Sequence, residues 1–228
     1  MKTEAMVLAR KGAAEQAFER RPIELRQLAA KEVMIESEAF GLNYADVMAR
    51  RGLYREAPPM PCVIGYELVG TIVQVGSDAD TKLIGQRVVA FCRFGGYGKH
   101  VITWDYAVVP IGDMKAEEAL VLCTQAVTAY YMAEYLTPIQ PGEKVLIHAA
   151  AGGVGTVLIQ LAKQKSATVF AKIGDESKRK LVKELGADHV VNYKQADYGQ
   201  EITKILGNDR LDVSYNPVGG TTSKIDMH

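Results

Sequence analysis

Residues 144–156 constrain the fold more than any other part of the chain. They begin with an apolar, β-branched run at 145–147, pass through a cluster of alanines and glycines, and reach apolar residues at helical spacing from Val157 onward. A strand, a tight turn and a helix in this order form the context that a dinucleotide-binding fingerprint requires. An ordinary strand-to-helix turn is the alternative interpretation.

The small residues of this turn are the candidate cofactor contacts. In the register of a G-x-G-x-x-G motif, the three key positions are Ala150, Gly152 and Gly155. Short side chains let the backbone approach a pyrophosphate and let the helix pack close to the strand. The helix N-terminus offers free N–H groups and a partial positive charge to phosphates. We therefore expect Ala150, Gly152, Gly153, Val154 and Gly155 to contact a dinucleotide.

Length, charge and cysteine content narrow the class of protein. The chain has 228 residues, enough for two domains, and its 27 basic and 27 acidic side chains give a net charge of zero. No basic block stands out, which argues against nucleic-acid binding. The first ten residues have too short an apolar run for a signal peptide. Three scattered cysteines indicate reduced thiols and a cytoplasmic location.

A transmembrane helix is the competing interpretation of the apolar stretch at residues 145–162. His148 and the run of small residues fit that interpretation poorly, and the periodicity changes midway. We therefore expect no membrane insertion.

The first half of the chain is typical of a compact, barrel-like β unit, because short strand patterns alternate with glycine-rich turns. A short helix is expected at 43–50, with Asn43 as its N-cap. The expected strands are residues 5–9, 32–40, 67–75, 87–91 and 97–109.

The second half has an α/β pattern that predicts a parallel sheet. A helix is expected at 115–136, and another begins near 221. Four strands are expected where two mononucleotide-binding halves need six, so the last strand has an open edge. We place the domain boundary after residue 125, giving domains 1–125 and 126–228. The expected strands are 144–149, 167–173, 189–193 and 211–215, separated by helices at 153–164, 176–185 and 197–206.

The end of the second strand favours NADPH over NADH. An NAD-binding protein usually places an acidic residue there to bind the ribose 2′-hydroxyl. Residues 171–174 contain no acid, and Asp175 lies beyond the strand, where it is placed to cap the next helix. Lys172 and Lys178 are candidates to face a 2′-phosphate, although Lys178 is equally typical of a solvated helix lysine.

Motifs along the whole chain, in a consistent order, resemble those of zinc-independent medium-chain dehydrogenase/reductases, specifically the NADPH:quinone oxidoreductase group and the related vesicle amine transport protein. The resemblance implies a GroES-like β domain followed by a Rossmann domain, which would be incomplete here. The motifs lie at residues 41–47 (Gly-Leu-Asn-Tyr-Ala-Asp-Val), 50–54, 65–70 (Gly-Tyr-Glu-Leu-Val-Gly), 85–88, 93–97, 128–131, 141–143, 149–155, 185–188 and 216–220.

The resemblance also assigns roles to individual residues. It places Asn43 and Tyr54 in the substrate cleft as hydrogen-bond donors, with helix capping and loop packing as the respective alternatives. It places Thr128 in a stretch that contacts the cofactor, with helix packing as the alternative. It implies that the 2′-phosphate of NADPH is bound by Gly174, Lys178 and Tyr193, the last of which is otherwise a strand-end aromatic.

The same motifs argue against a catalytic metal. Zinc-dependent relatives use a cysteine and a histidine at the positions of Asn43 and Tyr66, and neither side chain present here is a usual zinc ligand. Cys123 stands alone near the third position, where a buried thiol on a helix is the better interpretation. No Cys-x-x-Cys cluster is present, so a structural zinc site is not expected either.

We therefore expect an NADPH-dependent oxidoreductase that transfers hydride to a quinone or an activated enone without a catalytic metal. An electrophilic acceptor of this kind needs only orientation and modest hydrogen bonding at oxygen. An enoyl-thioester reductase is a second enzymatic interpretation. The non-enzymatic alternatives are an NADPH-binding protein without turnover and an inactive fragment of a longer reductase. The resemblance implies a homodimer for a longer parent protein, which is doubtful for this chain.

Overall fold

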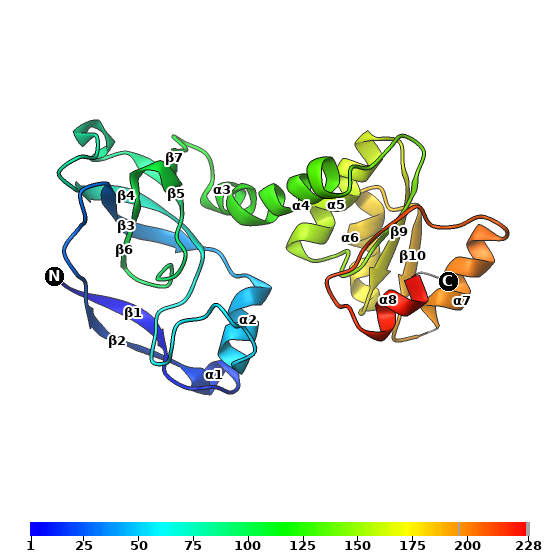
Figure 1. Ribbon diagram of the computed structural model, residues 1–228, viewed down its shortest axis with the longest axis horizontal. Helices are drawn as coiled ribbons and strands as arrows, with labels where there is room; N and C mark the ends of the chain where they lie inside the picture. The colour runs from blue at the N-terminus through cyan, green and yellow to red at the C-terminus, as the bar shows by residue number, and fades with distance from the viewer. Residues whose placement is uncertain (196, 227–228) are drawn as a thin grey trace. The chain divides into compact units, whose positions relative to one another are not determined.

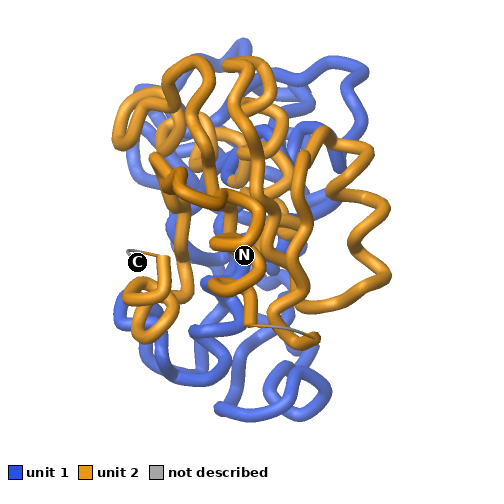
Figure 2. The backbone as a smooth tube through the Cα atoms, turned by 90° about the vertical axis from the view of Figure 1, so that its right-hand side faces the viewer, with its two compact units in different colours: residues 1–124 blue, residues 125–228 orange. Residues whose placement is uncertain are grey.

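The computed structural model describes residues 1–195 and 197–226. The chain divides into two compact units, residues 1–124 and 125–228, which Figure 2 shows in different colours. This division falls one residue before the boundary expected from the sequence. Each unit is described separately below.

The first unit contains a five-stranded antiparallel sheet in the order β6-β3-β4-β5-β7 (Figure 1). Alternate residues such as Val33, Ile35, Leu68 and Ile72 are fully buried and form one core of this unit. The strands at 32–40, 67–75 and 87–91 have the expected bounds. The sheet consists of β3 (Glu32–Phe40), β4 (Glu67–Val75), β5 (Arg87–Phe91), β6 (His100–Trp104) and β7 (Val108–Pro110), with a 3₁₀ turn, η1 (Thr81–Leu83), before β5.

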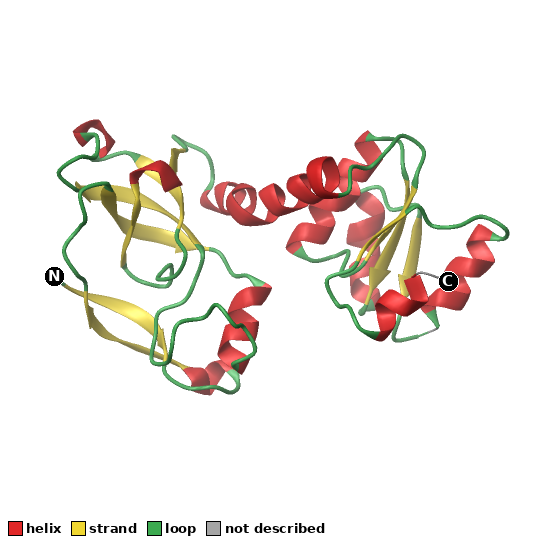
Figure 3. Cartoon of the chain, viewed as in Figure 1, coloured by secondary structure: helices red, strands yellow, loops and turns green. Residues whose placement is uncertain are grey.

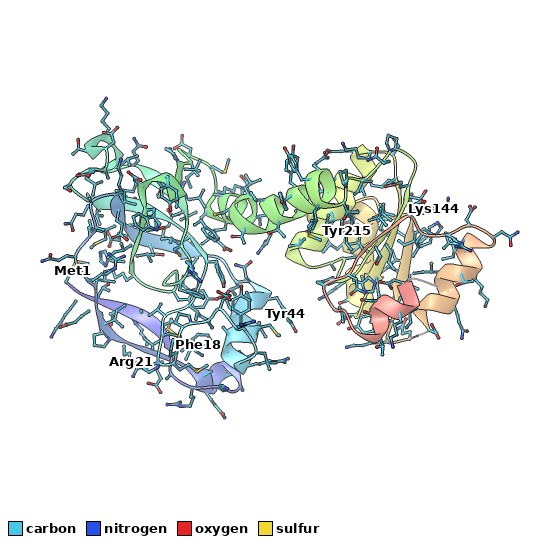
Figure 4. All side chains as sticks on the ribbon, in the orientation of Figure 1. Met1, Phe18, Arg21, Tyr44, Lys144 and Tyr215 are labelled. Atoms are coloured by element: carbon cyan, nitrogen blue, oxygen red, sulfur yellow. The ribbon has the colours of Figure 1, made fainter. Side chains whose placement is uncertain are left out.

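A separate hairpin at the start of the chain contains a strand that the sequence pattern did not reveal. Strand β1 (Lys2–Leu8) pairs antiparallel with β2 (Phe18–Glu24), and the short helix α1 (Ala14–Ala17) lies between them. Phe18 and Arg21, labelled in Figure 4, belong to β2. This strand is rich in charge and contains Pro22, which is compatible with a strand that pairs on one side only.

The expectation of one continuous strand at 97–109 was wrong. Tyr97 bonds instead to two other segments: its N–H donates to the Ile64 carbonyl (3.0 Å), and its carbonyl accepts from the Met6 N–H (3.0 Å). A 3₁₀ turn, η2 (Asp105–Ala107), then separates β6 from β7. The segment is broken because Tyr97 bonds to these two segments, whereas the residues of β6 pair with β3.

Two further helical segments occur in the chain before β8 (Lys144–Ile147). Helix α2 (Tyr44–Arg51) ends at Gly52, which takes a left-handed conformation (φ 70°) as helix C-caps commonly do. The helix expected at 115–136 is present and contains two π-helical segments. It comprises α3 (Ala116–Leu120), the π-helix η3 (Val121–Ala126), α4 (Val127–Tyr131) and the π-helix η4 (Met132–Leu136).

The second unit contains a four-stranded parallel sheet in the order β10-β9-β8-β11. Its strands are coloured yellow in Figure 3. The sheet has the four strands that the sequence pattern predicts. Lys144 begins β8 and Tyr215 ends β11; both are labelled in Figure 4. The elements are β8 (Lys144–Ile147), α5 (Gly153–Gln164), β9 (Thr168–Ile173), the 3₁₀ turn η5 (Glu176–Lys178), α6 (Arg179–Glu184), β10 (His189–Asn192), α7 (Tyr198–Leu206), β11 (Val213–Tyr215) and α8 (Thr221–Asp226).

Alternating side chains cover both faces of this parallel sheet. Val145, Ile147 and Val169 point into a core that includes Leu158 and Ile159 of α5. On the opposite face, the core joins one residue from each of three strands to α7 and comprises Leu146, Phe170, Val191, Tyr198 and Ile202. Both faces are therefore buried, as parallel sheets require. No helix among the described residues has the length and apolarity to cross a membrane.

Gly70 in β4 provides a test of the first sheet. A Cβ atom at Gly70 would lie 2.2 Å from the Glu36 carbonyl oxygen of β3, which cannot move without breaking the strand pairing. We expect Gly70→Ala to lower the free energy of unfolding by about 1–3 kcal/mol, measured by urea denaturation. Val73→Ala on the same strand is the control, because Val73 is 42% exposed and should cost less. Equal effects of the two substitutions would contradict this account.

Candidate functional site

The glycine-rich turn of the second unit leaves no room for a side chain at Gly155. A Cβ atom there would lie 2.5 Å from the Ala149 carbonyl oxygen and 2.7 Å from the Ala150 Cα. Ala149 itself has a positive φ of 48°, which few residues other than glycine adopt. The turn therefore brings α5 against the end of β8, which is the close approach that the motif predicts.

The other small residues of the turn are accessible or support it. Gly152 is the N-cap of α5 and Gly153 is its first residue, and both are exposed. Val154 packs against the core of this unit, and Ala150 is fully buried within it. The exposed glycines leave the helix N-terminus open to an anion, so the turn fits a pyrophosphate.

Gly174 and Tyr193 form a second candidate contact at the ends of β9 and β10. The Tyr193 hydroxyl lies 2.6 Å from the point that a Cβ atom at Gly174 would occupy. Gly174 stands where an NAD-binding protein would carry its acidic residue. An acid at this position would displace the Tyr193 ring, so the local packing disfavours the 2′-hydroxyl contact typical of NAD.

Asp175 does not replace the missing acid. Its Oδ1 accepts hydrogen bonds from the Ser177 backbone N–H (2.9 Å) and the Ser177 hydroxyl (2.8 Å), and it caps η5. These two bonds lower the pKa of Asp175, and nearby Lys178 and Lys194 add to the effect. The expected helix cap at Asp175 is present, and two lysines lie close to it.

Lys172 and Lys178, which the sequence offers as candidates to face a 2′-phosphate, lie in different environments. Lys178 is exposed at the end of η5, next to Asp175. Lys172 is only 4% exposed, and its Nζ lies 3.4 Å from the centroid of the Tyr198 ring. The expectation that Lys172 faces a 2′-phosphate is therefore corrected, because its side chain turns into the interior on the α7 face of the sheet.

Thr128 lies on the helix that passes the glycine turn. It is exposed on α4, three residues after Gln125. The Gln125 Oε1 lies 2.6 Å from the position of a Cβ atom at Gly153. This contact brings the helix that carries Thr128 beside the first turn of α5.

In the first unit, Asn43 is held at both its backbone and its side chain. Its backbone N–H donates to Asp46 Oδ2 (2.8 Å), which closes the start of α2. Its Nδ2 donates to both carboxylate oxygens of Glu67 (2.9 and 2.8 Å). The Thr124 hydroxyl donates to Glu67 Oε2 (2.5 Å). The helix-capping role expected as an alternative for Asn43 is present, and Glu67 is a partner that the sequence did not predict.

Glu67 is a completely buried carboxylate at the start of β4. Gly41 makes room for it, since a Cβ atom at Gly41 would lie 1.9 Å from Glu67 Oε1. Burial raises the pKa of Glu67, and hydrogen bonds from Thr124 and Asn43 oppose that rise. Burial likewise raises the pKa of nearby Asp46. An acidic residue opening an otherwise apolar strand is the sequence signal that identifies Glu67.

Tyr54 lies against Tyr66, the residue before Glu67. The two rings meet edge to face, with centroids 6.3 Å apart and an interplanar angle of 90°. Burial raises the pKa of Tyr66, and the Tyr54 side chain raises it further. Asn43 and Tyr54 therefore contact consecutive residues of one strand end, which brings these two candidate substrate residues into the same region of the first unit.

The residues at the positions where zinc-dependent relatives carry their ligands do not fit a zinc ion. The Asn43 amide is hydrogen-bonded to Glu67, and the raised pKa of Tyr66 keeps its phenol neutral. Burial raises the pKa of Cys123 to about 11, which disfavours a thiolate. Among residues 1–195 and 197–226, no group of three or more histidine, cysteine, aspartate or glutamate side chains is arranged to hold a metal.

Comparison with known proteins agrees with this two-unit organisation. Residues 29–128 match the family model of the alcohol dehydrogenase GroES-like domain, and residues 153–227 match that of the zinc-binding dehydrogenases. The fold is thus a GroES-like domain followed by a Rossmann-type dinucleotide-binding domain.

Individual relatives define the family more closely. The human synaptic vesicle membrane protein VAT-1 homolog is 36% identical over 192 residues, which are 83% of this chain and 48% of the relative. The Escherichia coli quinone oxidoreductase, solved in complex with NADPH, is 28% identical, with a TM-score of 0.87 over 98% of this chain and 69% of that one. The CurK enoyl reductase is 30% identical, with a TM-score of 0.85 over 99% of this chain and 70% of that one.

The chain belongs to the medium-chain dehydrogenase/reductase family, in its quinone oxidoreductase group. It spans about half the length of its vesicle-protein relatives.

The buried Glu67 predicts a distinctive pH dependence. Folding raises the pKa of Glu67, so the folded chain holds this proton more tightly than the unfolded chain. The free energy of unfolding therefore falls as the pH rises above the ordinary pKa of a glutamate. We expect the stability of Glu67→Gln relative to the unmodified chain to increase as the pH rises from the ordinary pKa of a glutamate to the raised pKa of Glu67, by at most about 1.4 kcal/mol per pH unit, and to level off above that pKa. Urea denaturation at several pH values measures this difference.

Glu36→Gln is the matched control, because Glu36 lies half-exposed on β3 beside Lys99. A stability difference between the Glu67→Gln variant and the unmodified chain that stays constant from about pH 4 to pH 8 would contradict the assignment.

Proposed function

We propose that this chain binds NADPH and acts as an oxidoreductase that reduces a quinone or an activated enone without a catalytic metal. The observation that carries the proposal is the arrangement of residues 150–155 with Gly174 and Tyr193, which we call the phosphate cradle of the second unit. Gly155 lets α5 approach the end of β8, while Tyr193 packs over Gly174 where NAD-binding proteins need an acid. The NADPH complex of the E. coli relative supports the same cofactor.

The residues of the cradle have distinct proposed roles. The pyrophosphate would lie at the N-terminus of α5, against the backbone of Gly152, Gly153 and Val154, with Ala150 and Gly155 allowing the close approach. Lys178 would pair with the 2′-phosphate, and Tyr193 would contact it beside Gly174. Thr128 would contact the cofactor from α4.

NADPH, when bound, supplies the hydride. The chain's own contribution at the acceptor is to orient it and to donate hydrogen bonds to its oxygen. The two Glu67 oxygens lie on one side of the Asn43 amide nitrogen, so one N–H serves both and the second N–H can donate to a substrate oxygen. Tyr54 would supply a second hydroxyl donor.

Two other functions remain in competition with quinone reduction. The similarity to CurK supports an enoyl-reductase activity, which uses the same cofactor chemistry on a conjugated thioester. The similarity to the synaptic vesicle membrane protein VAT-1 homolog, whose name states no catalytic activity, is the reason to test for a protein that binds NADPH without turnover. Substrate panels separate these functions from one another.

Cofactor selectivity is the first expected result. The unmodified chain should bind NADPH more tightly than NADH, and Lys178→Glu should weaken NADPH binding about tenfold while leaving NADH binding almost unchanged. Titration followed by the fluorescence of the reduced cofactor measures both affinities.

The matched control for this titration is Lys180→Glu, which makes the same charge change at an 85% exposed side chain on α6. Equal affinity of the unmodified chain for NADH and NADPH would contradict the 2′-phosphate site.

Turnover is the second expected result. NADPH oxidation with a panel of quinones, enones and enoyl thioesters should show activity, and Asn43→Ala should lower kcat/KM about tenfold or more without changing NADPH affinity, because a donor to the acceptor oxygen is lost. Asn208→Ala, at an exposed turn after α7, is the control. Saturable NADPH binding without oxidation of any substrate would favour the non-catalytic alternative.

A further inference from the structure

One carboxylate in the second unit is surrounded by four hydrogen-bond donors. Asp226, the last residue of α8, accepts from His148 Nε2 (2.9 Å), the Tyr198 hydroxyl (3.0 Å), the Ser214 hydroxyl (2.8 Å) and Asn216 Nδ2 (2.8 Å). The Asp226 side chain is only 4% exposed. Four donors fill the acceptor capacity of a carboxylate, so this is a complete carboxylate-binding site.

A buried lysine extends the site beyond the histidine. Lys172 Nζ lies 3.3 Å from His148 Nδ1, so the lysine donates to one ring nitrogen while the other carries the N–H that reaches Asp226. Burial and the charge of Lys172 lower the pKa of His148, which keeps the ring neutral with a single N–H. The lysine, histidine and aspartate form one buried hydrogen-bonded chain.

Helix α8 has few other attachments to the unit. Its one apolar side chain, Ile225, is 41% exposed. Ile225 lies against Gly199 of α7, and an open groove beside this contact is lined by Asp197, Gly199, Gln200, Thr203, Lys204 and Ile225. Apolar packing therefore holds α8 weakly, and Asp226 provides its principal anchor. Thr222 adds two smaller ones: its hydroxyl accepts from Asn216 Nδ2 (2.9 Å) and its carbonyl accepts from the Tyr198 hydroxyl (3.2 Å).

Three of the four donors, His148, Ser214 and Asn216, lie in or directly after strands β8 and β11 of the sheet that carries the cofactor cradle, and Tyr198 begins α7. His148 directly precedes Ala149 in the glycine turn, and Lys172 lies two residues before Gly174. The Lys172 carbonyl accepts from the Ala150 N–H (3.1 Å), and the Tyr215 carbonyl accepts from the His148 N–H (3.0 Å). The backbone of the cradle and the carboxylate site are therefore parts of one hydrogen-bonded assembly.

We propose that His148, Tyr198, Ser214 and Asn216 form a carboxylate-binding site through which Asp226 straps α8 onto the sheet, and that closure of this strap and binding of NADPH favour each other. The second half rests on the proposed cofactor. A closed strap fixes the ends of β8, β9 and β11, which preorganises the cradle for its ligand. Linkage requires that the ligand then stabilise the closed strap by the same factor.

Hydrogen exchange of α8, with and without NADPH, tests both halves. In the absence of cofactor, the α8 amides of Asp226→Asn should exchange at least tenfold faster than those of the unmodified chain. Ser214→Ala, which keeps the charge and removes one donor, should show a smaller increase. Asp209→Asn is the control, because Asp209 is 66% exposed and pairs with Lys144 at the surface. NADPH should slow α8 exchange in the unmodified chain, and its Kd should rise about fivefold in Asp226→Asn.

Each outcome decides a separate part of the proposal. Equal α8 exchange in Asp226→Asn and the unmodified chain would overturn the strap. Faster exchange in the variant, together with NADPH binding that leaves α8 exchange unchanged in the unmodified chain, would overturn the coupling. If the unmodified chain does not bind NADPH, the proposed function and the coupling both fail, and the cofactor-free exchange still decides the strap. Exchange across β8 to β10 reports whether each variant is folded.

Discussion

The second unit depends on the close approach of α5 to the end of β8 at Gly155. A side chain there would overlap the backbone of Ala149 and Ala150, so the strand, turn and helix fit together only with glycine at that position. This contact seats Leu158 and Ile159 against the sheet and aims the helix N-terminus at the strand ends. The geometry that buries the core therefore also creates the anion site, and packing and binding are satisfied by the same small residue.

Glu67 of the first unit and Asp226 of the second both have buried carboxylates, and the number of hydrogen-bond donors around each goes with the direction of its pKa shift. Glu67 receives bonds from two side chains, Asn43 and Thr124, which do not offset burial, and its pKa is raised. Burial also acts against the charged form of Asp226, but four donors outweigh it and the pKa is lowered. The comparison follows the expected competition between desolvation and hydrogen bonding to the charged form.

Local patterns in the sequence predict the parallel sheet, the glycine turn and most of the antiparallel strands, because alternation and small-residue spacing encode them directly. They do not predict β2, whose charged residues and Pro22 form a strand only because β1 lies beside it. They also misplace Lys172, since a lysine at a strand end is normally solvated, and its burial depends on Tyr198 and on His148. Glu67 and Asp226 acquire their roles from partners distant in the sequence, which periodicity does not reveal.

The strand order of the second unit implies an order of assembly. Strands β8, β9 and β10 are joined by short crossovers through α5 and α6, whereas β11 pairs with β8 only after the chain has passed through β10 and α7. Closing that long loop costs more entropy than forming either crossover. Because Ser214 lies in β11 and Asn216 follows it, two of the four donors to Asp226 exist only once β11 is in place. Helix α8 therefore cannot complete its carboxylate contacts before β11 has paired with β8.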